Sequence, residues 1–107
     1  MGVRGIVEWI DEHKPEFEKM ALDIWANPET AYREKQASRR QIEALAEAGF
    51  RIRAGVGGIP TAFVAEFGSG SPVIGILGEF DALPGLSQRV AATREPLGED
   101  DAAPGHG

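Results

Sequence analysis

The sequence predicts an α/β fold in which two helices are followed by three strands. Apolar residues recur at helical spacing over residues 3–26 and 35–48. Apolar and polar residues alternate over 50–54 and 61–67, which is the pattern of half-buried strands. Residues 73–78 form a continuous apolar run, typical of a central strand that is covered on both faces.

The boundaries of the first helix follow from its prolines. Ile6 and Ile10 are one turn apart, and charged residues occupy mostly the other faces. Pro15 either kinks this helix or lies in the first turn of a second one. Asn27 precedes Pro28 and is pushed out of the helical region, so we expect the helix to end there.

Glycine and turn residues delimit the elements that follow. Gly49 is the expected cap of the second helix, because glycine tolerates the left-handed conformation that closes many helices. The turn at 68–71 is short, so strands 61–67 and 73–78 are expected to pair antiparallel. Residues 86–107 lack periodicity and are rich in proline and glycine, which predicts a long loop.

Composition restricts the class of protein. At 107 residues the chain is at most one domain, and its 42% hydrophobic content is ordinary for a globular protein. The net charge of −6 argues against nucleic acid and against an anionic membrane surface as partners. The chain has no cysteine, no signal-peptide pattern and no membrane-length apolar run, so we expect a cytoplasmic location.

Two carboxylates follow the apolar run directly. Glu79 and Asp81 are two residues apart and would project to the same side of an extended strand. Carboxylates so paired can share a metal, orient a bound water, or divide into acid and base. Spacing alone favours two solvated charges where a strand leaves the core, whereas the surrounding sequence Leu-Gly-Glu-Phe-Asp-Ala-Leu-Pro favours a functional pair.

His106 lies between two glycines at the end of the sequence. Histidine is the commonest metal-ligating side chain, and flanking glycines allow close approach of the backbone. The alternative is a flexible terminal histidine without a ligand. Neither glycine-rich stretch, 55–58 or 68–71, has the spacing of a phosphate-binding loop, and both are interpreted as turns.

Several motifs occur together in one order and resemble the start of the M20 family of metallopeptidases and amidohydrolases. The most similar branch is that of the B subunit of aminobenzoyl-glutamate hydrolase. The resemblance runs from about residue 5 to Gly107, and its most specific part is the block 78–88. The motifs are Ile24-Trp25-Ala26-Asn27-Pro28-Glu29, Ala48-Gly49-Phe50, Ile59-Pro60-Thr61-Ala62-Phe63-Val64-Ala65 and Gly78-Glu79-Phe80-Asp81-Ala82-Leu83-Pro84-Gly85-Leu86-Ser87-Gln88.

The resemblance implies an α/β, zinc-peptidase-like catalytic domain that hydrolyses amide bonds of N-acyl or aminoacyl substrates with zinc or manganese. Asp81 matches an aspartate that lies beside the metal site and either orients a metal ligand or stabilises the metal centre. Glu79 and His106 are near-site candidates. Gly105-His106-Gly107 matches the opening of a Gly-His-Gly-Cys-Gly-His motif whose cysteine and second histidine bind metal, so no metal ligand is assigned to this chain.

On this resemblance, residues 1–107 are the N-terminal portion of a catalytic domain, incomplete and inactive by itself. The implied substrate is a small aminobenzoyl-glutamate-like or dipeptide-like amide, and the implied assembly is a homo-oligomer or a paired subunit. The alternative is a non-catalytic α/β binding module that retains the scaffold. The open edge of its sheet would then be its contact surface.

Overall fold

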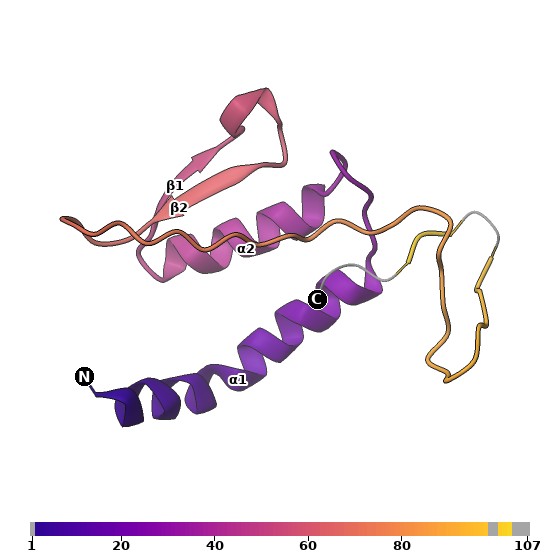
Figure 1. The fold of residues 1–107 in the computed structure, drawn as a ribbon, viewed down its shortest axis with the longest axis horizontal. Helices are drawn as coiled ribbons and strands as arrows, with labels where there is room; N and C mark the ends of the chain where they lie inside the picture. The colour runs from indigo at the N-terminus through magenta and orange to yellow at the C-terminus, as the bar shows by residue number, and fades with distance from the viewer. Residues whose placement is uncertain (1, 99–100, 104–107) are drawn as a thin grey trace.

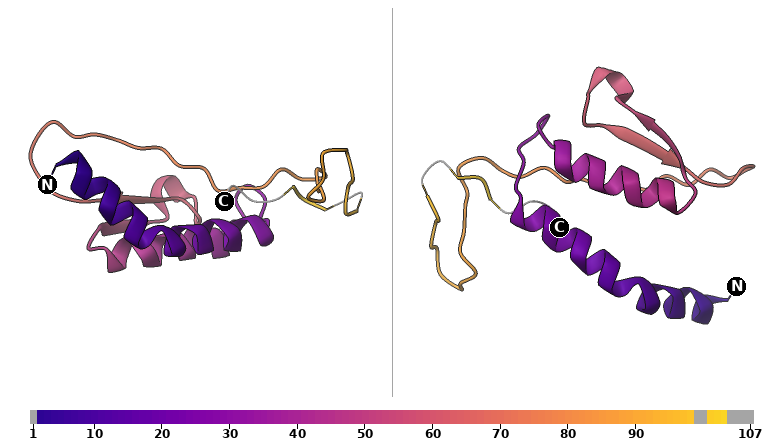
Figure 2. Two further views of the ribbon diagram at one scale, coloured as in Figure 1. Left: turned by 90° about the horizontal axis from the view of Figure 1, so that it is seen from below. Right: turned by 180° about the vertical axis from the view of Figure 1, so that it is seen from behind.

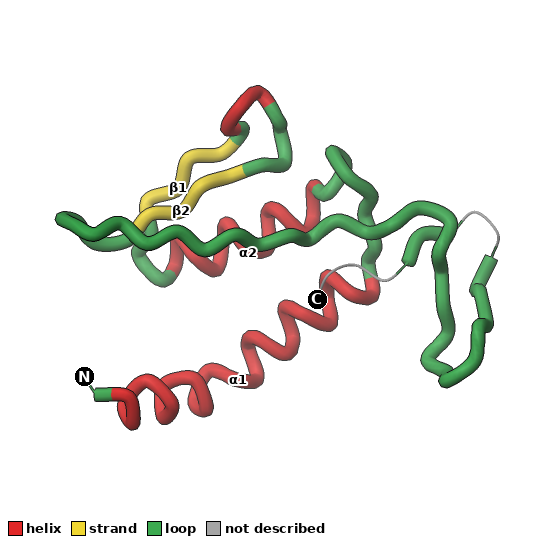
Figure 3. The backbone as a smooth tube through the Cα atoms, viewed as in Figure 1, coloured by secondary structure: helices red, strands yellow, loops and turns green. Residues whose placement is uncertain are grey.

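The computed structural model describes residues 2–98 and 101–103. Across these residues the chain forms two long helices, a β-hairpin with a short 3-10 turn in its loop, and segments without helix or strand after the hairpin (Figures 1 and 3). In chain order the elements are α1 (Val3–Ala26), α2 (Lys35–Glu47), β1 (Arg51–Ala54), η1 (Val56–Gly58) and β2 (Phe63–Glu66).

Helix α1 confirms the predicted helix and its end. It runs unbroken through Pro15, so the proline does not begin a separate helix. The helix bends part-way along its length (Figure 1), as expected where a proline removes one backbone hydrogen bond. Asn27 caps the C-terminus: its backbone N–H donates to the carbonyl of Ile24 at 3.3 Å, and its side chain donates to the carbonyl of Asp23 at 2.8 Å.

Helix α2 closes in the way that its glycine predicts. Gly49 has a φ of 89°, in the left-handed region. Its N–H donates to Ala46 O, and the N–H of Phe50 donates to Leu45 O, each at 3.0 Å. This pair of bonds is the Schellman motif, which satisfies carbonyl groups that the helix leaves open. The chain thereby reverses direction directly into the hairpin.

The hairpin confirms the first two predicted strands. Strands β1 and β2 pair antiparallel, with Arg51 opposite Glu66 and Ala54 opposite Phe63. The N–H of Gly55, a left-handed residue, donates to the carbonyl of Ala62 at 2.8 Å and closes the end of the ladder. The aromatic rings that flank the other end, Phe50 and Phe67, lie 5.2 Å apart.

Helix α2 lies between α1 and the hairpin, as the views in Figures 1 and 2 show. Among the described residues, the buried apolar side chains are those of Ile24, Ala37 and Ala82. They come from α1, from the first turn of α2 and from the segment after the apolar run. The core is therefore small and lies where these three parts of the chain meet.

The predicted third strand is not formed. Residues 73–78 are extended, but β2 pairs with β1 alone, so the expected antiparallel pairing of 61–67 with 73–78 is wrong for this structure. The segment stands away from the helices (Figure 2). Its apolar side chains are 82–97% exposed, where burial was expected (Val73, Ile74, Ile76 and Leu77). A strand needs a partner edge and apolar cover, and the described residues supply neither to this segment.

Residues 86–98 and 101–103 contain no helix or strand. Much of this stretch projects beyond the ends of the helices (Figures 1 and 2). Hydrogen bonds nevertheless brace it internally, since the N–H of Arg89 donates to Glu95 O at 2.8 Å and that of Ser87 to Asp101 O at 3.0 Å. The stretch is an ordered irregular loop across these residues.

We predict that Gly49→Ala destabilises the chain by about 1 kcal/mol, because an alanine at this φ meets a left-handed backbone penalty. The space itself is adequate, since an added Cβ would lie 3.7 Å from the Phe67 ring. Urea unfolding followed by circular dichroism measures the change. Gly75→Ala, at a glycine without positive φ and with open space around it, is the control and should have little effect. An equal loss in both variants would contradict the account.

Candidate functional site

The structure places the two predicted carboxylates in different surroundings. Glu79 is exposed, whereas Asp81 is half-buried. The ring of Phe80 between them stacks on Phe63 of β2, with ring centroids 6.1 Å apart. Ala82, directly after Asp81, is only 3% exposed. The chain therefore changes at Phe80 from an exposed segment to one that is packed against the rest of the molecule. His106, the third candidate, lies outside the described residues.

Backbone contacts fix the segment directly after Asp81. The N–H of Ala82 donates to the carbonyl of Glu29 at 2.8 Å, and Thr30 and Ala82 form an isolated parallel β-bridge. One residue later, the carbonyl of Leu83 accepts the N–H of Ala103 at 2.8 Å. Asp81 thus lies at a junction of the loop after α1, the end of the apolar run and the irregular loop.

Glu29 belongs to this junction through its side chain as well. Its Oε1 accepts the N–H groups of Gln36 at 3.0 Å and Ala37 at 2.8 Å, and its Oε2 lies 3.1 Å from the Gln36 nitrogen. These N–H groups belong to the first turn of α2 and have no partner within the helix. A carboxylate there also interacts favourably with the positive end of the helix dipole.

The residue at the usual capping position, Glu34, makes a different contact. Its carboxylate accepts the hydroxyl proton of Thr61 at 2.7 Å, and both residues are buried, at 8% and 6% exposure. This bond joins the start of α2 to the loop that leads into β2. Because Glu34 is directed toward the hairpin, the cap of α2 comes from Glu29 instead.

Ser87 and Gln88 organise the irregular loop, a role that the sequence reasoning missed. Ser87 is 4% exposed. Its hydroxyl donates to Gly98 O at 3.0 Å and accepts the N–H of Leu97 at 3.0 Å. The Gln88 amide donates to Thr93 O and accepts from the Glu95 N–H. The signal was present, since both residues end the most specific motif block, but spacing alone gave neither a role.

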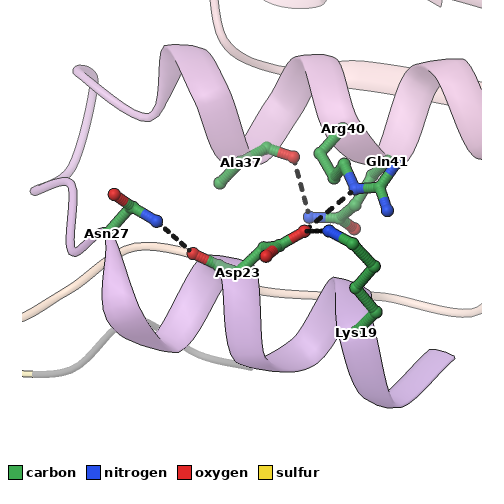
Figure 4. Close-up of polar contacts among 6 residues, drawn as sticks. All are labelled: Lys19, Asp23, Asn27, Ala37, Arg40 and Gln41. Atoms are coloured by element: carbon green, nitrogen blue, oxygen red, sulfur yellow. Dashed lines mark hydrogen bonds and ion pairs between the residues drawn. The ribbon is translucent and has the colours of Figure 1, made fainter. Parts of the chain in front are cut away.

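A shallow hollow of about 280 Å³ lies between α1 and α2, and Asp23 and Arg40 are among its lining residues. Figure 4 shows Asp23 between two cations: its Oδ2 is 2.7 Å from Lys19 Nζ and 3.6 Å from Arg40 Nε. The hydrogen bond from Lys19, followed by the charges of Lys19 and Arg40, lowers the pKa of Asp23 below its ordinary value of 3.8. Neither Glu79 nor Asp81 is among the residues that line this hollow.

Within residues 2–98 and 101–103, no group of three or more histidine, cysteine, aspartate or glutamate side chains is arranged to hold a metal ion. No metal ligand is assigned among these residues, and no chemical step is assigned to a metal here. In the same part of the chain, no helix is long and apolar enough to cross a membrane.

No family model matches the sequence. Among curated proteins, the B subunit of p-aminobenzoyl-glutamate hydrolase from Escherichia coli (strain K12) is 41% identical over 104 residues. The predicted resemblance is confirmed. The match covers 97% of this chain, and this chain spans 21% of the relative's length. By its name, that relative hydrolyses p-aminobenzoyl-glutamate and is one subunit of an assembly.

We predict that the pair between Asp23 and its cations stabilises the fold above the ordinary pKa of 3.8, where the carboxylate is charged in both states. Because the folded-state pKa is the lower one, this contribution is lost as the pH falls from 3.8 through the folded value. Urea midpoints of the wild type and Asp23→Asn should therefore differ at pH 6, and the difference should shrink as the pH is lowered below 3.8. Asp11→Asn, an exposed aspartate of α1, is the control; a constant gap for Asp23→Asn would contradict the pairing.

Proposed function

We propose that this chain forms part of a hydrolase that cleaves the amide bond of an N-acyl or aminoacyl amino acid. The identity with the Escherichia coli hydrolase supports the reaction class, because the similarity extends over nearly the whole chain. The observation that carries the proposal is the position of Asp81, a half-buried carboxylate next to a residue held by two backbone contacts. A group held so firmly is suited to orient reacting groups.

Amide hydrolysis adds a water oxygen to the carbonyl carbon, breaks the C–N bond and delivers a proton to the leaving amine. We assign Asp81 an orienting role in this reaction: its carboxylate accepts a hydrogen bond from a neighbouring group of the active site and holds that group in place. Glu79 is exposed and is assigned no step. His106 stays a near-site candidate.

We further propose that the complete hydrolase uses zinc or manganese and acts on a small amide, such as an aminobenzoyl-glutamate-like or dipeptide-like substrate. The relative's name supports the aminobenzoyl-glutamate class and an assembly of paired subunits. A homo-oligomer is the other arrangement that the resemblance implies. We also propose a cytoplasmic location and no nucleic-acid or membrane partner, in keeping with the net charge of −6.

The first test uses a hybrid of the Escherichia coli protein in which this chain replaces the matched 104-residue stretch. The hybrid, expressed with the relative's own partner subunits, should hydrolyse p-aminobenzoyl-glutamate. Asp81→Asn should lower kcat roughly 10- to 100-fold, since amide oxygen and nitrogen cannot replace both carboxylate oxygens as acceptors. Glu79→Gln, a matched change two residues away, is the control and should leave kcat close to that of the unaltered hybrid. Equal losses in both variants would contradict the assignment.

The second test titrates the 107-residue chain with zinc and with manganese, because no metal ligand is assigned to it. Isothermal calorimetry should detect no stoichiometric metal binding with a Kd below about 1 μM. Binding that tight requires several preorganised metal ligands in one site. A well-formed site of sub-micromolar affinity would show that the ligand assignment is wrong. Asp81→Asn, measured in parallel, would then show whether Asp81 is one of the ligands.

One observation favours a second candidate, a non-catalytic binding module. The apolar side chains of residues 73–77 are 82–97% exposed, and an extended apolar segment without a partner strand is a surface on which another chain can pair. The hybrid distinguishes the two proposals. A folded hybrid without any hydrolysis, in the unaltered form as well as in the variants, would favour the module.

A further inference from the structure

We infer that Glu29 is a positioning residue for Asp81, an inference that rests on the proposed function of Asp81. The carboxylate of Glu29 is anchored at the start of α2, and the carbonyl of the same residue receives the N–H of Ala82. Asp81 is joined to that N–H by one peptide bond. Through Glu29, the start of helix α2 thereby sets the position of the segment that carries the Asp81 carboxylate.

The anchor at α2 depends on one oxygen in particular. Oε1 of Glu29 lies 3.0 Å from the Gln36 nitrogen and 2.8 Å from the Ala37 nitrogen. Glu34, the residue at the capping position, makes no side-chain cap and is directed to Thr61. Glu29 therefore supplies hydrogen bonds that the first turn of α2 does not obtain from Glu34. Ala37 is buried, at 3% exposure, which shields this end of the contact from water.

The link from the carboxylate to the carbonyl is short. Side chain and carbonyl share one Cα atom, and Pro28 restricts the backbone just before it. Thr30, just after it, forms the β-bridge with Ala82. The backbone is thus restricted on both sides of Glu29. Anchoring the Glu29 side chain at α2 therefore also holds the Glu29 carbonyl within hydrogen-bond distance of the Ala82 N–H, at 2.8 Å.

The segment before Asp81 cannot provide this position by its own packing. The apolar side chains of residues 73–77 are 82–97% exposed. Ordered contacts begin at Phe80, whose ring stacks on Phe63, and continue at Ala82. The contact at Ala82 is thus the backbone restraint nearest to Asp81 on its C-terminal side, and Glu29 provides its acceptor.

The experiment compares two conservative changes in the 107-residue chain. Glu29→Gln keeps the length of the side chain and an oxygen at the Oε1 position but loses the charge. Glu29→Asp keeps the charge but is too short by one methylene to reach the Gln36 and Ala37 nitrogens. Ala44→Gly in α2 is the matched control, because it weakens the same helix by about 1 kcal/mol without touching Glu29. The measurement is the rate of amide hydrogen exchange at Ala82, followed by NMR. For each variant, the change in this rate is divided by the change in the equilibrium constant for global unfolding, so that any excess reports local opening.

We expect Glu29→Asp to speed exchange at Ala82 by about tenfold beyond its effect on global unfolding, as a local opening does. Glu29→Gln and Ala44→Gly should show no such excess. An excess in Glu29→Gln but not in Glu29→Asp would show that charge at the helix end matters rather than reach, and would overturn the inference. Equal corrected rates in all variants would overturn it as well.

Activity of the hybrid then connects the anchor to catalysis. Glu29→Asp should lower kcat about tenfold with little change in KM, and Glu29→Gln should restore most of it, because misplacement of a site group affects mainly the chemical step. Ala44→Gly, compared with Glu29→Asp at a temperature where both hybrids are equally folded, should leave kcat near that of the unaltered hybrid. An unchanged kcat in Glu29→Asp would overturn the positioning role. A wholly inactive hybrid would instead count against the proposed function, while the exchange result still decides whether Glu29 anchors Ala82.

Discussion

The contact of Glu29 with the first turn of α2 determines how the separate parts of this chain meet. Its carboxylate accepts the N–H groups of Gln36 and Ala37, and its carbonyl accepts that of Ala82. A helix end left without partners costs free energy when it is buried. Here one residue removes that cost and also brings together the end of α1, the start of α2 and the segment that carries Asp81.

The buried bond between Glu34 and Thr61 is a second contact at the same end of α2. Because Glu34 accepts the Thr61 hydroxyl at 2.7 Å, the start of the helix is tied to the hairpin as well. A buried carboxylate with a donor is tolerated, whereas one without a donor is costly. Glu29 thus anchors the segment that carries Asp81, and Glu34 anchors the hairpin. Both contacts lie beside the small apolar core and add polar bonds between the elements that form it.

Local patterns predicted the local elements. Periodicity gave both helices, Gly49 gave the closure of α2, and alternation gave the hairpin. The prediction of a third strand was wrong. Residues 73–78 have the composition of a strand, but pairing also requires the free edge of a partner strand, which composition does not specify. The Asp81 segment was singled out by its motif block, but its anchor to Glu29 is a contact between distant parts of the sequence. Ser87 belonged to the same motif block, but in a loop without periodicity its position did not reveal its polar role.

The loop after α1 lies directly beside Ala82, the residue that follows Asp81. The chain has no cysteine, so a disulfide engineered between Thr30→Cys and Ala82→Cys tests this without interference. Bridge partners lie within the Cα separation that a disulfide requires. The account predicts rapid, nearly complete crosslinking on mild oxidation, read by mass spectrometry under non-reducing conditions. Thr30→Cys paired with Val90→Cys on the projecting loop is the control. Crosslinking no faster than in this control would contradict the account.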